Sequence, residues 1–220
     1  TGSLKFDLSI PDNLSHRAAE FKTSWQLQGR PVWVAASTHD GEDAVILEAF
    51  KLIQESFPNA LLLLVPRHPE RFDKVAELIA KQGFSLARRS LKQDIEPSIS
   101  VFLGDSIGEL LLWLALADVA FIGGSLVNVG GHNPLEPAAL AVPIVTGLTM
   151  FNFQQITDTL IDAGALKQGK DSQELTAIVC EWLKNPEQKQ KDGQAGLQVV
   201  LANRGALAKH LAIVDRLLKS

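Results

Sequence analysis

Cysteine and long apolar runs are scarce in this 220-residue sequence. Cys180 is the one cysteine, which excludes an internal disulfide framework and a cysteine-rich metal site. The longest apolar runs, residues 60–66 and 110–117, fall well short of the roughly 18 residues that a transmembrane helix requires. Methionine is equally rare. Met150 is the only one and the chain begins with Thr1, so we expect a processed chain or a fragment of a longer protein.

The motifs of several enzyme classes are also missing. There is no G-x-G-x-x-G of a dinucleotide-binding fold and no G-x-x-x-x-G-K-[ST] of a P-loop. There is no H-E-x-x-H, no Asp-x-Asp pair and no Cys–His cluster, so we expect no metal and no other cofactor. Nucleophilic catalysis by a cysteine lacks support because Cys180 falls inside an expected amphipathic helix.

Charge of either sign is modest. The chain has 21 Lys and Arg against 25 Asp and Glu, a formal net charge of −4, and 46% of its residues are hydrophobic. The mild acidity argues against a protein that coats nucleic acid or an anionic membrane. At roughly 100–200 residues per domain, the length fits one large domain or two small ones with a sizeable core.

Short apolar runs alternate with amphipathic segments from residue 30 onward. Strands are expected at residues 31–36, 60–65, 84–89, 99–103, 118–122 and 143–146. Helices are expected at residues 42–56, 69–82, 108–117, 133–141, 153–163, 171–184 and 188–218, the last with a break near Gly205. This alternation predicts an α/β fold with an open, doubly wound, mostly parallel sheet.

The first 29 residues differ from the rest. Residues 4–8 alternate apolar with polar side chains, as a short strand does, and residues 14–28 form a weak helix that Gly29 ends. We therefore divide the chain into a connector, residues 1–29, made of a strand and a helix, and a sheet domain, residues 30–220.

Polar residues collect where the expected strands end. Three of the five histidines, His39, His68 and His132, lie at these junctions. Arg67 does too, after a strand that contains four leucines, and a cation there suits the rim of a cleft. Ligands of open α/β sheets bind beyond the carboxyl ends of the strands, so this co-location is the main functional signal.

A glycine-rich segment, residues 123–131, joins an expected strand to the helix that begins at Asn133. Glycine lets the backbone approach a ligand closely, and a helix N-terminus attracts an anion. A long turn with good helix caps is the alternative. Asn133 and Glu136 have capping-box spacing, so Glu136 either caps the helix or accepts hydrogen bonds from two ribose hydroxyls.

The other candidates have ordinary structural interpretations as well. Arg67 and His68 either bind an anion or form surface salt bridges, for instance with Glu70. His39 and His132 either belong to the site or serve as capping or solvent-facing histidines.

Seven segments together carry a family resemblance. They read LKFD at residues 4–7, ASTHDGE at 36–42, PRHPERF at 66–72, GDSIGEL at 104–110, FIGGSL at 121–126, GGHNPLEPA at 130–138 and NF at 152–153. In this order they resemble the 3-deoxy-D-manno-octulosonic acid (Kdo) transferases of Gram-negative bacteria, which add Kdo from CMP-Kdo to the lipid A precursor. The sequence departs from the family pattern in three places. Gly2-Ser3 stands where an asparagine is usual, and Ser106 replaces a common threonine. Leu148 follows Gly147 where proline is frequent, which leaves the shape of loop 147–152 open.

The resemblance implies the C-terminal half of a GT-B glycosyltransferase, a Rossmann-like domain that binds CMP-Kdo. The N-terminal domain, with the lipid acceptor site and a glutamate general base, is then absent, so we expect little or no turnover. The expected partners are CMP-Kdo and, through the missing domain, the lipid A precursor, but no nucleic acid. Membrane contact is expected only through the missing part, with the intact enzyme at the cytoplasmic face of the inner membrane and this part soluble.

Carried over by motif, the resemblance implies a donor site without a catalytic residue in this chain. Arg67 is expected to stabilise the leaving phosphate during displacement with inversion, and Glu136 to hold the ribose. The expected donor-binding residues are Ser37, Thr38, His39, Pro66, Arg67, His68, Asp105, Ser106, Gly108, Gly123, Gly124, Ser125, His132, Asn133, Glu136 and Asn152. The alternative is a nucleotide-binding module, or half of a UDP-sugar epimerase or transferase, without Kdo transfer.

Overall fold

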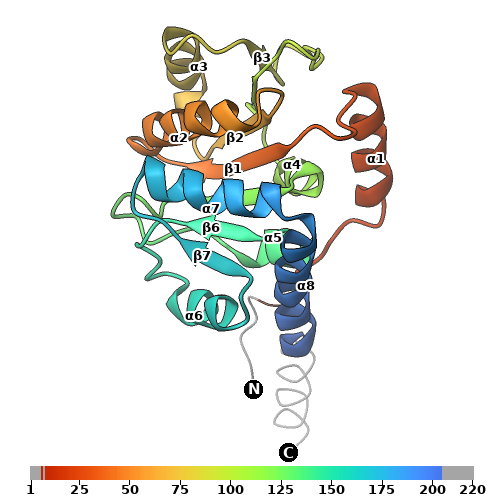
Figure 1. The fold of residues 1–220 in the computed structure, drawn as a ribbon, viewed down its shortest axis with the longest axis vertical. Coiled ribbons are helices and arrows are strands. Elements are labelled where there is room, and N and C mark those ends of the chain that lie inside the picture. The colour runs from red at the N-terminus through yellow and green to blue at the C-terminus, as the bar shows by residue number, and fades with distance from the viewer. Residues whose placement is uncertain (1–5, 7, 205–220) are drawn as a thin grey trace, which may run out of the picture.

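The computed structural model describes residues 6 and 8–204, in which helices cover both faces of a central sheet (Figure 1). Seven strands lie in the order β3-β4-β2-β1-β5-β6-β7, and every neighbouring pair is parallel. The strands are β1 (Val32–Thr38), β2 (Leu61–Pro66), β3 (Leu86–Arg88), β4 (Val101–Leu103), β5 (Val119–Ile122), β6 (Ile144–Thr146) and β7 (Leu166–Gln168). The predicted doubly wound sheet is confirmed.

The helices divide into two groups according to the apolar cluster that they join. One face carries α2 (Glu42–Ser56), α3 (Phe72–Lys81), which follows the 3-10 turn η2 (Pro69–Arg71), and α7 (Ser172–Lys184). The other carries α1 (Leu14–Ser24), α4 (Leu110–Leu116), α5 (Leu135–Ala139), α6 (Gln154–Asp162) and α8 (Pro186–Asn203). None of the helices in the described ranges combines the length and the apolar character that a membrane crossing needs.

Strand β1 shows why both faces need a cover. All of its residues are buried. Trp33 and Ala35 pack in the cluster with α2 and α7, whereas Val34 and Ala36 pack in the cluster with α4 and α5. Because successive side chains of a strand point to opposite faces, a continuously apolar strand belongs between two layers of helices.

Helix α1 docks onto this domain through aromatic rings. Trp25, just beyond its last turn, stacks on Trp113 of α4 with ring centroids 6.0 Å apart. The same ring lies 4.8 Å from Phe102 of β4, and Phe21 meets it edge-on at 4.6 Å. The helix predicted as part of a connector therefore shares the core of the sheet domain, and its role as an interdomain connector stays a prediction.

The chain order reverses at β1. From β1 the chain passes to β2, β3 and β4 on one side, and it then crosses to β5 on the other side. The segments that follow β1 and β5 therefore diverge at the carboxyl edge of the sheet, which is where open α/β sheets bind ligands. Segments 39–41 and 123–134 both lie at this switch point.

Two predicted elements at the amino-terminal side are corrected by the structure. Of the predicted strand at residues 4–8, only Phe6 and Leu8 are described, and neither pairs with the sheet. Phe6 lies in a 3-10 turn and is buried in the core, so its apolar character reflects packing. The predicted helix at residues 69–82 begins as η2 and becomes α-helical only at Phe72, a common form of helix start.

Three further differences concern the carboxyl-terminal half. The predicted helix at residues 133–141 is reduced to α5, which ends before Ala141 because that residue has a left-handed φ of 56°. Strand β7 was not predicted, since its three residues show no alternation that a sequence pattern can detect. Helix α8 ends at Asn203, and the predicted continuation to residue 218, with its break near Gly205, lies outside the described residues.

We expect Gly123→Ala to destabilise the fold by about 2–3 kcal/mol. A methyl group at Gly123 would lie 2.3 Å from the carbonyl oxygen of Ser37, so β1 and β5 would have to separate at their ends. Gly83→Ala is the control, because its φ of 84° costs about 1 kcal/mol but no atom lies near the added methyl group. Urea unfolding measures both, and equal losses would contradict the prediction.

Candidate functional site

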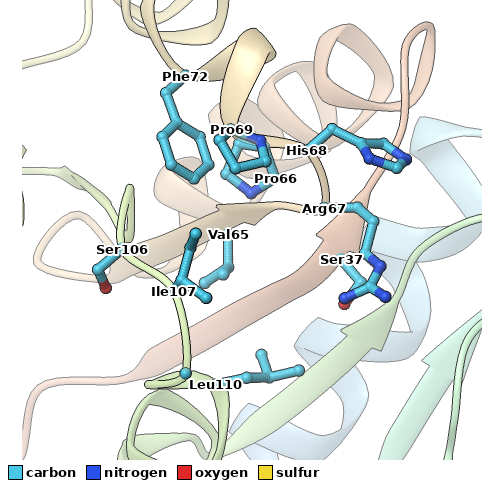
Figure 2. Close-up of a pocket in the computed structure, with 11 residues that line it drawn as sticks. Ser37, Val65, Pro66, Arg67, His68, Pro69, Phe72, Ser106, Ile107 and Leu110 are labelled. Carbon is cyan, nitrogen blue, oxygen red and sulfur yellow. The ribbon is translucent and has the colours of Figure 1, made fainter.

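A pocket of about 300 Å³ opens at the carboxyl edge of the sheet, among the segments that follow β1, β2 and β4 (Figure 2). Figure 2 shows the Arg67 side chain extending toward Ser37, with Ser106 across the opening. Of the residues predicted from the sequence, the lining contains Ser37, Pro66, Arg67, His68, Ser106 and Gly108. Residues far apart in the sequence therefore share one pocket, as the strand-end argument predicts.

Ser37 reaches the pocket through an irregularity at the end of β1. The register of β1 against β2 shifts between Ala36 and Thr38, and Ser37 has a left-handed φ of 57°. Non-glycine residues rarely adopt this conformation, and it persists only where the surroundings enforce it. Here the backbone of Gly123 packs directly against the Ser37 carbonyl and holds the strained turn at the pocket.

Thr38 has an internal role. Its hydroxyl donates to Asp43 Oδ1 over 2.6 Å, and Arg71 donates to the Thr38 carbonyl over 2.6 Å and to Asp43 Oδ2. Thr38 and Asp43 are both buried. Burial raises the pKa of Asp43, although the hydrogen bonds from Thr38 and Arg71 oppose that rise. The Thr38 hydroxyl is thus committed to fastening the loop after β1.

The amides of the glycine-rich segment are bound by a carboxylate of the protein itself. Glu42, at the first turn of α2, is fully buried. Its Oε1 accepts the backbone N–H groups of Ser125 (3.0 Å) and Leu126 (2.9 Å). Its Oε2 accepts those of Gly124 (2.7 Å) and His39 (2.8 Å). Gly124 and Ser125, predicted to contact a phosphate, therefore offer their amides to Glu42.

Three histidines meet at the switch point. The Nε2 atoms of His39 and His132 lie 2.7 Å apart with the rings nearly parallel, and His68 meets the His39 ring edge-on at 5.2 Å between centroids. Burial, assisted by the nearby His39, Arg67 and His68, lowers the pKa of His132 to about 4. Burial also lowers the pKa of His39, where Glu42 opposes it. Both rings are therefore neutral at neutral pH.

Arg67 is exposed, and within the described residues its guanidinium makes neither a hydrogen bond nor an ion pair. The alternative interpretation paired Arg67 and His68 with Glu70. Only His68 comes near that carboxylate, at 4.0 Å and with both side chains exposed, which contributes little. The positive charge of Arg67 acts to lower the pKa of His39, of His132 and of Glu136, so these three side chains lie near its guanidinium.

Glu136 does not complete a capping box. Asn133 Oδ1 accepts the backbone N–H of Leu135 over 3.1 Å, which caps α5 from one side only. The Glu136 carboxylate has no hydrogen-bond partner among the described residues. Burial raises the pKa of Glu136, and the charge of Arg67 opposes that rise. A half-buried carboxylate without a partner is available to a ligand.

Asp105, the first polar residue after β4, forms hydrogen bonds with neighbouring protein groups. It is buried and accepts the Ser90 amide (2.7 Å), the Ser90 hydroxyl (2.6 Å) and Arg88 Nε (2.7 Å). Burial acts to raise the pKa of Asp105, but these hydrogen bonds outweigh it and lower that pKa. The carboxylate is therefore fully used within the protein.

Glu109 ties the pocket wall to α1. Its carboxylate accepts a hydrogen bond from the Ser106 hydroxyl over 2.6 Å. Arg89 donates to it in a bidentate manner, from Nε and Nη2, with both N–O distances 2.8 Å. Arg17 of α1 donates to the same carboxylate over 3.4 Å. The Arg89 hydrogen bond is the main reason that the pKa of Glu109 is lowered. Ser106 thus lines the pocket with its hydroxyl directed to Glu109.

Asn152 and the Ser125 side chain brace the glycine-rich segment. Asn152 Nδ2 donates to the Val129 carbonyl over 2.9 Å, and the Asn152 backbone N–H donates to the Gly130 carbonyl. The Ser125 hydroxyl donates to Ile122 and accepts the Gly147 amide. These contacts hold the segments after β5 and β6 against each other.

The sequence argument missed Glu42 and Arg71. Both look ordinary in sequence: Glu42 follows Gly41 at a helix start, where an acidic residue is common, and Arg71 lies in a charged surface turn. Their roles depend on contacts with Leu126 and Thr38, far away in the chain, which no local pattern encodes.

Comparison with known proteins identifies the family. No family model matches the chain. A 3-deoxy-D-manno-octulosonic acid transferase of Haemophilus influenzae is 44% identical over 215 residues, which are 97% of this chain and 50% of that protein. The crystal structure of the C-terminal CMP-Kdo binding domain of WaaA from Acinetobacter baumannii is 42% identical, with a TM-score of 0.81 over 86% of this chain and 97% of that one. The chain belongs to the Kdo transferase family.

Within this family the chain corresponds to the C-terminal domain, and it spans about half the length of the curated Kdo transferases that it matches. The fold is that of GT-B glycosyltransferase C-terminal domains. HepE of Anabaena, in complex with UDP and glucose, shares it with a TM-score of 0.60 over 98% of this chain and 54% of that one. At 14% identity this likeness concerns the fold alone.

We expect Glu42→Gln to lower the free energy of unfolding by about 2–4 kcal/mol, because an amide NH₂ would face two of the four buried N–H donors. Glu48→Gln, at an exposed position of the same helix, is the matched control and should change stability by under about 0.5 kcal/mol. Urea unfolding decides between them. Similar values for the two variants would show that the Glu42 contacts are not needed.

Proposed function

We propose that this chain is the donor-binding domain of a Kdo transferase and that it binds CMP-Kdo at the pocket lined by Ser37, Arg67 and Ser106. The supporting observation is that Arg67 lines this pocket and Glu136 lies within electrostatic reach of Arg67, and neither side chain has a hydrogen-bond partner among the described residues. A nucleotide offers complementary groups: a phosphate for the cation and ribose hydroxyls for the carboxylate. The family relationship supplies the identity of the nucleotide.

The proposed arrangement follows the free groups of the site. Arg67 and His68 bind the phosphate, and Glu136 accepts hydrogen bonds from the ribose hydroxyls. The backbone of residues 106–108 lines the cytosine side of the pocket. Ser37 and His39 face the sugar acid, whose carboxylate needs a donor.

The mechanism that fits this arrangement is displacement at the anomeric carbon. As the bond to the phosphate breaks, negative charge grows on CMP. A guanidinium beside that phosphate stabilises the developing negative charge more than the ground state, which lowers the barrier to the reaction. The proposal for the whole enzyme has further parts. The reaction inverts the anomeric carbon, a glutamate of the N-terminal domain is the general base, and the lipid A precursor is the acceptor. The enzyme acts at the cytoplasmic face of the inner membrane.

The choice of nucleotide tests the proposed function. Isothermal titration of the chain with CMP, UMP and UDP should give the highest affinity for CMP. A clear preference for UDP would contradict the proposal and favour a UDP-sugar enzyme of the same fold.

Arg67→Ala should weaken CMP binding by roughly 10- to 150-fold, the effect of losing one charge-assisted contact. The fold should be unaffected, because within the described residues the guanidinium makes no hydrogen bond or ion pair. Arg204→Ala, at another exposed arginine, is the matched control and should bind CMP as the wild type does. Titration calorimetry measures the affinities and circular dichroism checks the fold. An unchanged affinity would remove Arg67 from the site.

A further inference from the structure

Three consecutive amides at the start of the glycine-rich segment are not free to bind an incoming phosphate. The amides of Gly124, Ser125 and Leu126 all donate to the buried carboxylate of Glu42. That carboxylate also adds a negative charge beside the site. The anion-binding capacity of these three amides is therefore used within the protein, which leaves side chains near the pocket as the source of full positive charge for a phosphate.

Among the arginines near the pocket, one carries a charge that no ion pair within the described residues offsets. Arg71 is paired with Asp43, and Arg88 is paired with Asp105 and Asp73. Arg67 remains, with one positive charge. A phosphate monoester carries between one and two negative charges near neutral pH. One charge therefore lacks a partner, and His39 and His132, whose pKa values the charge of Arg67 lowers, lie close enough to supply it.

The contact between His39 and His132 fixes how many protons the pair holds. With Nε2 atoms 2.7 Å apart, one ring donates a proton that the other accepts, so the two neutral rings are different tautomers. The donating ring has an unprotonated Nδ1. A proton added there leaves the Nε2–H···Nε2 hydrogen bond intact. A second proton would put hydrogens on both Nε2 atoms and break it. The pair thus has room for one positive charge.

We propose that the His39–His132 pair takes up one proton from solvent when the phosphate monoester of CMP binds beside Arg67, and that this proton supplies the second positive charge of the site. The inference rests on the proposed function, because it needs a phosphate at Arg67. The proton adds to the free Nδ1 of the donating ring, and no other bond is made or broken.

The surroundings of the pair give the sign of the effect. Without ligand, burial holds the pKa of His132 at about 4 and lowers that of His39. From the segment after β2 and from η2, the charges of Arg67 and Arg71 and the nearby His68 lower the pKa of His39 further, while Glu42 on α2 opposes them. A phosphate bound to Arg67 offsets that cation and adds negative charge, which raises a neighbouring histidine pKa by about 1–3 units.

Glu136 on α5 is the remaining charged group of this surround, and it acts on Arg67. Burial raises the pKa of Glu136, which weakens its attraction to Arg67 in the free protein. Ribose hydroxyls that donate to Glu136 favour its charged form. The nucleoside part of a ligand therefore favours a negative charge on Glu136, beside Arg67.

Nitrogen-15 NMR of labelled histidine observes the proton directly. At pH 6, the His132 ring should give the signal of a neutral tautomer in the free chain. With saturating CMP, one ring of the pair should shift to the imidazolium range. Two neutral rings at saturating CMP would overturn the inference while the proposed function stands. Failure of CMP to bind would overturn both.

Calorimetry with a matched pair of variants gives the proton count. CMP is titrated at pH 6 in two buffers with different ionisation enthalpies, and the ligand's own phosphate contributes equally in every variant. The wild type should take up roughly half a proton or more per site beyond the uptake of His132→Gln. His16→Gln, at an exposed histidine of α1, should match the wild type. Equal uptake by the wild type and His132→Gln would overturn the inference.

Discussion

The buried carboxylate of Glu42 is the contact on which the site depends. It binds one amide before α2 and three amides after β5, so a single side chain joins the two segments that diverge at the switch point. A buried charge is tolerated when hydrogen bonds compensate for the lost water, and four N–H donors meet that condition. With the segments joined in this way, His39 and His132 lie within hydrogen-bond distance of each other.

We call Glu42 and its four amide donors the Glu42 clamp, and the polar residues around it divide into two kinds. Thr38, Asp105 and the Ser125 hydroxyl are satisfied by the protein and hold backbone segments in place. Arg67 and Glu136 have no such partner among the described residues, and they are the groups with free capacity for a ligand. A list of polar residues near strand ends contains both kinds, and only the hydrogen-bond pattern separates them.

The sequence predicted the larger features because they follow from local physics. Continuous apolar runs such as β2 are typical of strands covered on both faces, and their alternation with helices gives the parallel sheet and its ligand-binding edge. The pocket positions of Arg67 and His68 followed from that edge. The Glu42 clamp and the histidine contact were beyond such reasoning, because each joins segments more than eighty residues apart. Strand β7 was missed for a different reason, since only one of its three residues, Leu166, is apolar.

The pairing of Arg17 with Glu109 has a mechanical consequence. Glu109 also receives the Ser106 hydroxyl and both prongs of Arg89, while the Trp25 ring stacks on the helix that begins at the next residue. The first helix cannot tilt without either breaking these contacts or dragging the 106–108 segment with it. A displacement of α1 is therefore coupled to the 106–108 wall of the pocket.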